Sequence, residues 1–435
     1  MLGHDVASTY FNQHETKIST ASARALVRAW ELDTKAGVTS TPVISRGRVY
    51  VLTTASDSET TGGVIAIDLA TGAVIWQNAA ARGYSSLALD AGILYAHDAG
   101  GVVRALDAEN GQELWEYKTD DSPYLAGFSS PVVTKDFVLV GGSSLEETVT
   151  RPGESATFRG FVVALNKADG RPAWKKLTVE PPSNGAAIWS TLSVDEAAGV
   201  VFAATGNNYT GVASNTSDAF LALALAGNPS FLWTQQILAG DVVTVAQSNG
   251  NPEADFGANP ILFEAGGRKL VAGGNKGGDF WVLDRSDGTI LKKRNLGPSS
   301  AFKGGIFNSG AWDGSHLLVA VNGAKSAEPG SESAPSGKEA TLFALDPLTL
   351  DIAWERQVAG PVYSPISVAG GVGFFGKNTT LQAFDTKTGE VLFEFPTEGT
   401  IATAPAVSEG YVIFGSGMSW IQAVSGTKYY ALRVP

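Results

Sequence analysis

The chain has 435 residues, a formal net charge of −12 and no cysteine. Without cysteine the protein has no disulfide, no cysteine–zinc site and no covalently attached c-type haem. The acidic balance and the lack of any basic run argue against nucleic acid as a partner. The apolar runs are of strand length, well short of the roughly 20 residues that a membrane helix needs, so we expect no membrane span.

One unit recurs along the chain: a strand, a turn ending in glycine, and a second strand ending in tryptophan. The clearest copies are VIAIDLATGAVIW (64–76), VRALDAENGQELW (103–115) and VVALNKADGRPAW (162–174). Each turn begins with a side chain that can accept backbone N–H bonds, at Asp68, Asp107 and Asn166. Each turn closes with a glycine that can take positive φ, at Gly72, Gly111 and Gly170. We expect the closing aromatic ring to lie flat against the next unit.

Weaker copies continue the pattern at 221–233, 282–292, 344–354 and 383–393. Lys292 stands where the aromatic residue is expected, Leu350 where the glycine is expected, and Phe393 replaces tryptophan. The first unit, LVRAWELD around Trp30, lacks its preceding strand, and the terminal KYYALRVP supplies it. The aromatic-type positions are therefore 30, 76, 115, 174, 233, 292, 354 and 393.

Strand pairs precede these units, as in STPVISRGRVYVL (40–52) and TAPAVSEGYVIFG (403–415), and no convincing helical period occurs. Four strands in each of eight units predict an all-β fold, an eight-bladed β-propeller whose terminal strands close one blade together. We expect a single domain over residues 1–435. Its predicted insertions lie near 143–160, 180–187, 234–255 and 322–340. Two β-sandwich domains are the alternative, but sandwich strands do not repeat a turn-plus-tryptophan signature.

Several motifs outside the repeat resemble a known family. In chain order they are GHDVASTYFN (3–12), SSLEE (143–147), TFRGFVVALN (157–166), AAIWSTLSVD (186–195), ATGNNY (204–209), ADFGANPIL (254–262) and NKGGDFWVLDR (275–285). Their order and spacing resemble the quinoprotein alcohol dehydrogenases that depend on pyrroloquinoline quinone (PQQ), above all the polyvinyl-alcohol dehydrogenase-like proteins without a haem domain. The resemblance covers nearly the whole chain.

The resemblance implies roles for individual residues. Glu146, with Glu147 as an acceptable substitute, matches the metal-binding carboxylate, and Asn207 matches the metal-binding amide. Asp255 matches the catalytic base that also reaches the metal, and Lys276 matches the cation at the quinone oxygens. Trp189 matches the aromatic floor beneath the cofactor. Ser129, Ser143 and Asn308 are further candidates for cofactor binding. Arg159 is a candidate for supporting the residues that contact the cofactor.

The resemblance also implies the chemistry. PQQ would accept electrons from a small or polymeric alcohol, a secondary one first, with Ca²⁺ as Lewis acid and an external electron acceptor. Such an enzyme would be periplasmic or secreted, although Met1 is followed by no signal-peptide pattern. Ser85-Ser86 and Glu154-Ser155 stand where relatives carry cysteine pairs.

Each site residue also has a structural interpretation. Glu146 could be an exposed carboxylate of an insertion, Asn207 a turn residue, Asp255 a cap and Lys276 a solvated lysine. Two other functions stay open. One is a non-catalytic scaffold like the outer-membrane assembly lipoproteins, and the other is a propeller repurposed for a redox-neutral reaction. The acidic, amide and lysine residues in family order favour the enzyme.

Overall fold

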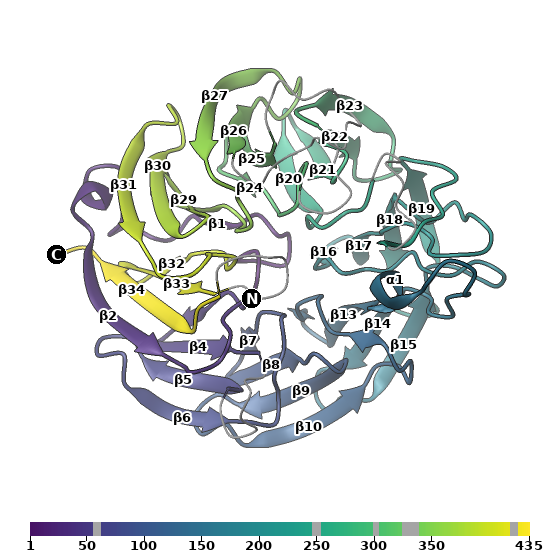
Figure 1. The fold of residues 1–435 in the computed structure, drawn as a ribbon, viewed down its shortest axis with the longest axis horizontal. Helices are drawn as coiled ribbons and strands as arrows, with labels where there is room; N and C mark the ends of the chain where they lie inside the picture. Colours follow the sequence, from purple (N-terminus) through teal and green to yellow (C-terminus); the bar gives the residue numbers. More distant parts are fainter. Residues whose placement is uncertain (55–61, 246–253, 299–303, 324–338, 418–424) are drawn as a thin grey trace.

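The computed structural model describes residues 1–54, 62–245, 254–298, 304–323, 339–417 and 425–435. Within this part, eight antiparallel sheets follow one another around a central axis (Figure 1). The eight-bladed propeller is therefore confirmed. The insertions predicted near 234–255 and 322–340 lie partly outside the described residues.

The first four blades follow in chain order. Blade 1 contains β3 (Val43–Ser45), β4 (Arg48–Leu52), β5 (Val64–Asp68) and β6 (Val74–Asn78). Blade 2 contains β7 (Ala88–Asp90), β8 (Ile93–His97), β9 (Val102–Asp107) and β10 (Glu113–Lys118). Blade 3 contains β11 (Leu125–Ala126), β12 (Val132–Val133), β13 (Phe137–Ser144), the helix α1 (Glu146–Val149), β14 (Phe161–Asn166) and β15 (Pro172–Leu177). Blade 4 contains β16 (Ser193–Asp195), β17 (Val200–Ala204), β18 (Ala219–Ala224) and β19 (Phe231–Gln236).

The ring continues with four further blades. Blade 5 contains β20 (Ile261–Ala265), β21 (Arg268–Gly274), β22 (Asp279–Asp284) and β23 (Ile290–Asn295). Blade 6 contains β24 (Ala311–Trp312), β25 (Leu317–Asn322), β26 (Glu339–Leu345) and β27 (Ile352–Ala359). Blade 7 contains β28 (Ser367–Ala369), β29 (Val372–Lys377), β30 (Thr380–Asp385) and β31 (Val391–Pro396), with β1 (Phe11–Asn12) added in parallel to β28. Blade 8 contains β32 (Ala406–Ser408), β33 (Tyr411–Ser416), β34 (Lys428–Arg433) and β2 (Val27–Asp33).

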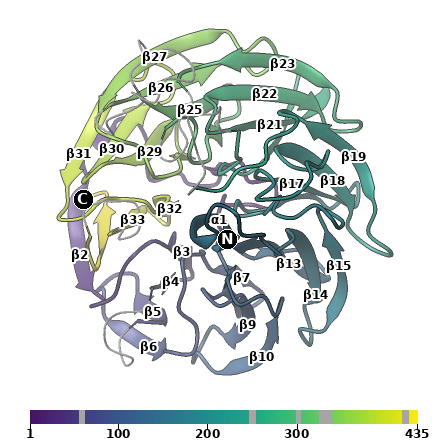
Figure 2. The same ribbon diagram turned by 45° about the vertical axis from the view of Figure 1, so that its right-hand side comes forward.

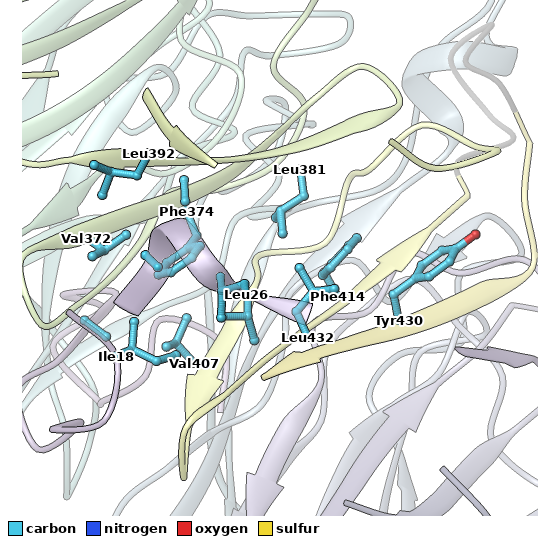
Figure 3. Packing of buried hydrophobic residues seen from close by; sticks show 14 of the residues in the cluster. Ile18, Leu26, Val372, Phe374, Leu381, Leu392, Val407, Phe414, Tyr430 and Leu432 are labelled. Carbon is cyan, nitrogen blue, oxygen red and sulfur yellow. The ribbon is translucent and has the colours of Figure 1, made fainter. Parts of the chain in front are cut away.

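The ends of the chain close blade 8, as the sequence predicted. β2, which follows the short 3-10 helix η1 (Ser22–Ala25), pairs antiparallel with the terminal strand β34, and Trp30 lies opposite Ala431. Figure 3 shows the core between blades 7 and 8, where Phe374, Phe414 and Leu432 pack with Ile18 and Leu26 of the N-terminal segment. Burying each large apolar side chain stabilises the closure by about 1.5–3 kcal/mol.

The N-terminal segment also ties five blades together. The backbone oxygens of residues 6, 7, 9 and 10 accept N–H bonds from blades 4, 5, 6 and 7 in turn: Val194, Leu262, Trp312 and Val368 are the donors, at 2.7–2.9 Å. The Asn12 amide then donates to Val407 O of blade 8 at 2.8 Å. The segment starts near the ring centre (Figure 1), whereas the turned view in Figure 2 follows the blades around it.

Neighbouring blades are joined by the repeated tryptophans. Each indole N–H donates to a carbonyl oxygen in the turn of the following blade: Trp30 to Leu69, Trp76 to Ala108, Trp115 to Lys167, Trp174 to Leu225, Trp233 to Arg285 and Trp354 to Thr386, at 2.8–3.2 Å. Gly72 and Gly111 take φ of +75°, and a Cβ at either would meet the ring of the preceding tryptophan. The expected contact of aromatic ring and turn is confirmed.

The turn side chains follow the prediction with one exception. Asp68 Oδ1 accepts the Thr71 N–H at 2.9 Å, and Asp107 Oδ1 accepts the Glu109 N–H at 2.7 Å. The prediction was wrong for Asn166, whose Nδ2 donates to Arg171 O at 3.1 Å while its backbone oxygen accepts the turn N–H bonds. An amide can donate as well as accept, and here the donor end is turned toward the backbone.

The two weakest copies of the repeat meet at one contact, between blades 5 and 6. Lys292 of blade 5 supplies no ring to stack on the turn of blade 6, so the turn position there tolerates a side chain. Leu350 occupies it at φ +60°, is 1% exposed, and packs into the core between the two blades. Arg294 replaces the indole donor, because its guanidinium donates to Leu350 O at 2.9 Å.

Two glycines test this packing. Gly389 (φ +72°) lies against Trp354, whose Cε3 would be 2.7 Å from an added Cβ, whereas Gly227 (φ +82°) faces open space. Gly227→Ala should cost about 1–2 kcal/mol from the left-handed backbone alone. Gly389→Ala should cost about 1–3 kcal/mol more from overpacking. Guanidinium unfolding of both variants measures the difference, and equal losses would contradict the ring contact.

A ring of side chains near the axis adds a second link between blades. Backbone N–H groups donate to the side chain of the next blade in the order Ala404 to Thr41, Thr41 to Ser86, Ser86 to Ser130, Ser130 to Thr191, Thr191 to Asn259 and Asn259 to Ser309, at 2.8–3.0 Å. Ser86 is one of these links, because its side chain accepts the Thr41 N–H while its own backbone N–H donates to Ser130.

Candidate functional site

The site residues gather at one face because every blade has the same strand directions. Asp255 precedes β20 and Lys276 follows β21, so both lie at the same end of blade 5. Their charged groups form a buried ion pair, with Lys276 Nζ 2.9 Å from Asp255 Oδ2. The Lys276 backbone N–H also donates to Asp255 O at 3.1 Å.

Asp255 also contacts blade 4. Its Oδ1 accepts the backbone N–H of Asn207 at 2.8 Å, and the side chain is 1% exposed. Gly206 permits this approach, because a Cβ at residue 206 would lie 2.6 Å from Asp255 Oδ1. The carboxylate is therefore held between two blades by a lysine and a backbone amide.

Trp189 lies beside this pair. The Lys276 ammonium is 5.3 Å from the centroid of the Trp189 ring, within the range of a cation–π interaction. Phe307 packs against the indole at a centroid distance of 5.9 Å. Gly257 lies so close to the ring that a Cβ there would collide with it. Trp189 is thus clamped in place as a flat aromatic surface.

A cavity of about 330 Å³ opens beside Trp189, within the size range of small-ligand sites. Asp255, Lys276 and Glu147 supply its charged groups. The rest of its lining is largely apolar or aromatic: Phe128, Leu145, Ala187, Trp189, Tyr209, Val245 and Phe307, with Ser143, Ser144 and Thr148. A second, smaller cavity of about 130 Å³ shares Phe128, Trp189 and Phe307 with the first.

Glu146 and Glu147 have opposite surroundings. The Glu146 carboxylate accepts three hydrogen bonds, from the Thr157 N–H (2.8 Å), the Phe158 N–H (2.7 Å) and the Thr157 hydroxyl (2.9 Å). Glu146 therefore secures the 157–158 segment and is not among the residues that line the cavity. The next residue of α1, Glu147, lines it instead.

The remaining predicted residues divide into two groups. Asn207 is fully buried and its Nδ2 donates to Asn208 O and Val243 O, while its Oδ1 has no hydrogen-bond partner. Ser143 lines the cavity, and its hydroxyl donates to Ala126 O at 2.6 Å. Ser129 does not line either cavity; its Oγ accepts the Gly141 N–H at 3.0 Å.

Two further residues lie away from the pair. Asn308 lines the smaller cavity and donates its amide to Tyr363 O. Arg159 forms an ion pair with the exposed Glu180 at 3.2 Å. Sequence reasoning missed Phe307, which lines both cavities. Its position next to the predicted Asn308 was the available signal.

The acidic groups of the site act on one another. Burial raises the pKa of Glu147 to about 8, and the negative charge of Asp255 adds to the rise while Lys276 opposes it. Burial likewise raises the pKa of Asp241 to about 6, again with Asp255 adding to the rise. Burial and then Glu147 raise the pKa of Tyr209.

This coupling predicts how stability depends on pH in the metal-free protein. An unfolded glutamate titrates near pH 4.5, so between that pH and about 8 the folded chain keeps a proton that the unfolded chain has lost. The free energy of unfolding should therefore fall as pH rises through this window. Glu147→Gln should flatten the slope, whereas Glu154→Gln, an exposed carboxylate, should not. Guanidinium unfolding from about pH 5 to 9 measures the pH dependence of the free energy of unfolding for both variants. A slope for Glu147→Gln equal to that of wild type would refute the raised pKa of Glu147.

The donor set fits a hard cation and a flat cofactor. Within the described ranges, no three His, Asp or Glu side chains are placed to hold a metal by themselves. Calcium also takes amide oxygens, and the buried Asn207 Oδ1 lacks any donor. Glu147, Asn207 and Asp255 thus suit Ca²⁺. The clamped Trp189 ring and the Lys276 cation suit a flat, electron-accepting ring.

Comparison with known proteins identifies the family. A family model named PQQ_2 and described as outer membrane protein assembly factor BamB matches residues 17–294 and 276–433. The chain belongs to the PQQ_2 family. Within the described part of this PQQ_2 chain, no helix is long and apolar enough to cross a membrane.

Individual relatives carry enzyme names. The chain is 31% identical over 337 residues to a polyvinylalcohol dehydrogenase of Sphingopyxis sp. (strain 113P3), covering 68% of this chain and 50% of the relative. It is 28% identical over 355 residues to a polyvinylalcohol dehydrogenase of Pseudomonas sp., covering 72% and 55%. The chain thus spans about half the length of these relatives.

Solved structures show the same fold. The quinohemoprotein alcohol dehydrogenase from Comamonas testosteroni superposes with a TM-score of 0.76 at 21% identity, over 100% of this chain and 80% of that one. At this identity the match supports the eight-bladed architecture alone. The predicted family resemblance is confirmed, and the roles of individual residues stay predictions.

Proposed function

We propose that this protein oxidises an alcohol with PQQ and Ca²⁺ and passes the electrons to an external acceptor. The observation that carries the proposal is the buried Asp255–Lys276 ion pair at the Trp189 ring, in an otherwise largely apolar cavity. The alcohol dehydrogenase names of the relatives support it.

Each part of the site has a proposed task. Trp189 would support the flat cofactor, with Ser143 near its edge. Glu147, Asn207 and Asp255 would hold Ca²⁺, with Glu147 in the role first given to Glu146. PQQ, when bound, supplies the two-electron acceptor for the alcohol.

The chain's own residues would then do the proton chemistry. Asp255 would accept the hydroxyl proton of the alcohol at Oδ2, the oxygen that faces Lys276. The Lys276 ammonium provides a fixed positive charge at the Trp189 ring, where it can stabilise negative charge that builds up during the reaction. The largely apolar lining keeps water away from both groups and strengthens their effect.

The substrate proposal follows from the cavity wall. Leu145 and Val245 line the cavity and are 43% and 41% exposed, so they continue the apolar surface toward solvent. An alcohol on an aliphatic carbon chain, small or polymeric and secondary first, suits this wall better than a sugar. A periplasmic or secreted location is part of the same proposal.

Reconstitution tests the function. Purified protein is loaded with PQQ and Ca²⁺ and assayed for alcohol-dependent reduction of an artificial electron acceptor across primary, secondary and polymeric alcohols. The proposal expects reduction that requires PQQ, Ca²⁺ and alcohol together, strongest with secondary alcohols. No reduction with any alcohol would remove the enzyme and favour a non-catalytic role, such as that of the assembly factor in the family description.

A further inference from the structure

The smaller cavity of about 130 Å³, called the axial chamber below, receives residues from the segments that lead into the inner strands of all eight blades. One set belongs to the ring of side chains that links the blades: Thr41, Ser86, Ser130, Thr191, Asn259 and Ser309. A second set stands two residues earlier in each blade and is mostly aromatic: Tyr84, Phe128, Trp189, Phe307 and Tyr363. The chamber therefore has a hydroxyl-rich layer and an aromatic layer.

The lining of the axial chamber is uncharged. Among the residues that the structure describes, those that line it include no Asp, Glu, Lys, Arg or His. An ion, or a cofactor that carries carboxylates, would give up its hydration here without an opposite charge, which is costly. The volume is also below the roughly 300 Å³ at which sites for drug-sized ligands begin. The chamber therefore suits a neutral molecule of a few heavy atoms.

The hydroxyl-rich layer has hydrogen-bonding capacity that the ring does not use. The hydroxyl oxygens of Ser86, Ser130 and Thr191 each accept one backbone N–H of the ring. Over the described ranges, no protein acceptor binds the O–H groups of these three side chains. Thr39 Oγ1, also in the lining, is buried without a hydrogen-bond partner. Since a hydroxyl donates one bond and accepts two, these side chains can bind several oxygen atoms of a ligand.

The aromatic layer adds apolar area beside these hydroxyls. Phe307 packs against Trp189 at a centroid distance of 5.9 Å and against Tyr363 at 5.8 Å. Tyr84 and Phe128 form a second pair, with centroids 5.4 Å apart. Water alone would leave these rings without an apolar contact. A short carbon skeleton that carries several hydroxyl groups matches both layers, because its C–H groups can pack on the rings while its oxygens bind the free hydroxyls.

We propose that the axial chamber binds a small neutral polyol, a diol or triol of a few carbons. The site is separate from the charged cavity that holds Asp255 and Lys276, and the inference does not rest on the proposed redox reaction. Trp189 and Phe307 line both cavities, so the polyol contacts rings that also form the wall of the proposed cofactor site.

Saturation-transfer NMR with glycerol and ethylene glycol tests the proposal on the cofactor-free protein. Wild type should give a saturable signal at millimolar polyol. Ala402→Leu places a larger side chain in the chamber and should abolish the signal. Thr39→Val removes one free hydroxyl at nearly constant shape and should weaken binding about 2- to 10-fold, the effect of one hydrogen bond. Thr388→Val, in an exposed turn of blade 7, is the control and should bind like wild type.

Two results would overturn the inference. Wild type without a saturable signal from either polyol would leave the chamber to water alone. A signal that persists unchanged in Ala402→Leu would place the polyol elsewhere on the protein. If Ala402→Leu does not fold, Thr39→Val decides, and an affinity equal to that of Thr388→Val would refute the site. Because neither PQQ nor turnover enters this experiment, its failure leaves the proposed function standing.

Discussion

Asp255→Asn is expected to lower kcat by about 10²- to 10⁴-fold, the range that a general base contributes. Asparagine keeps the shape of the side chain and can still accept the Asn207 N–H, but its amide cannot take a proton. Asp255 lies 2.9 Å from Lys276 Nζ and is 1% exposed, so solvent is a poor substitute for it. Dye-linked turnover of the reconstituted protein measures the loss.

The control for this variant is a carboxylate outside the site. Asp385→Asn changes the net charge equally, and its kcat should match wild type. Asp255→Asn should still retain PQQ, because Trp189 and Lys276 remain and an asparagine oxygen can still bind Ca²⁺. Wild-type turnover by Asp255→Asn would remove Asp255 from the role of base.

Lys276→Met is expected to lower the free energy of unfolding by about 3–5 kcal/mol in the cofactor-free protein. Removing one member of a buried ion pair leaves the other charge in a low-dielectric site. The Lys276 and Asp255 side chains are 10% and 1% exposed. Guanidinium unfolding near neutral pH measures the change.

Lys293→Met is the matched control. Lys293 lies in the same blade and is also 2.9 Å from its partner, Asp279, but its side chain is 53% exposed. Exposed ion pairs contribute about 0–1 kcal/mol, so this variant should lose little. Equal losses in the two variants would show that the Lys276–Asp255 pair is not buried in solution.

The sequence was most informative where the chain repeats. A turn aspartate, a positive-φ glycine and a closing tryptophan form one physical contact, so each recurrence predicts a blade. The same contact also explains why two copies depart from the repeat pattern. Lys292 and Leu350 look like independent losses in the sequence, yet without a ring above it the turn can carry the Leu350 side chain. Only the structure shows that they belong together.

The sequence was least informative where two neighbouring residues could each face the cavity. Glu146 and Glu147 are adjacent on one turn of helix, where successive side chains point about 100° apart. Which of them faces the cavity depends on the 157–158 segment, whose N–H groups bind Glu146.

The central claim is that the cavity beside Trp189 and Lys276 is a PQQ site, and retention of PQQ measures it most directly. Protein incubated with PQQ and Ca²⁺ is passed through gel filtration, and bound quinone is quantified by absorbance for wild type and Trp189→Ala. We predict about one PQQ per chain for wild type, lost on chelation of Ca²⁺ and strongly reduced in Trp189→Ala. Wild-type protein that emerges without PQQ, or Trp189→Ala that retains as much as wild type, would contradict the account.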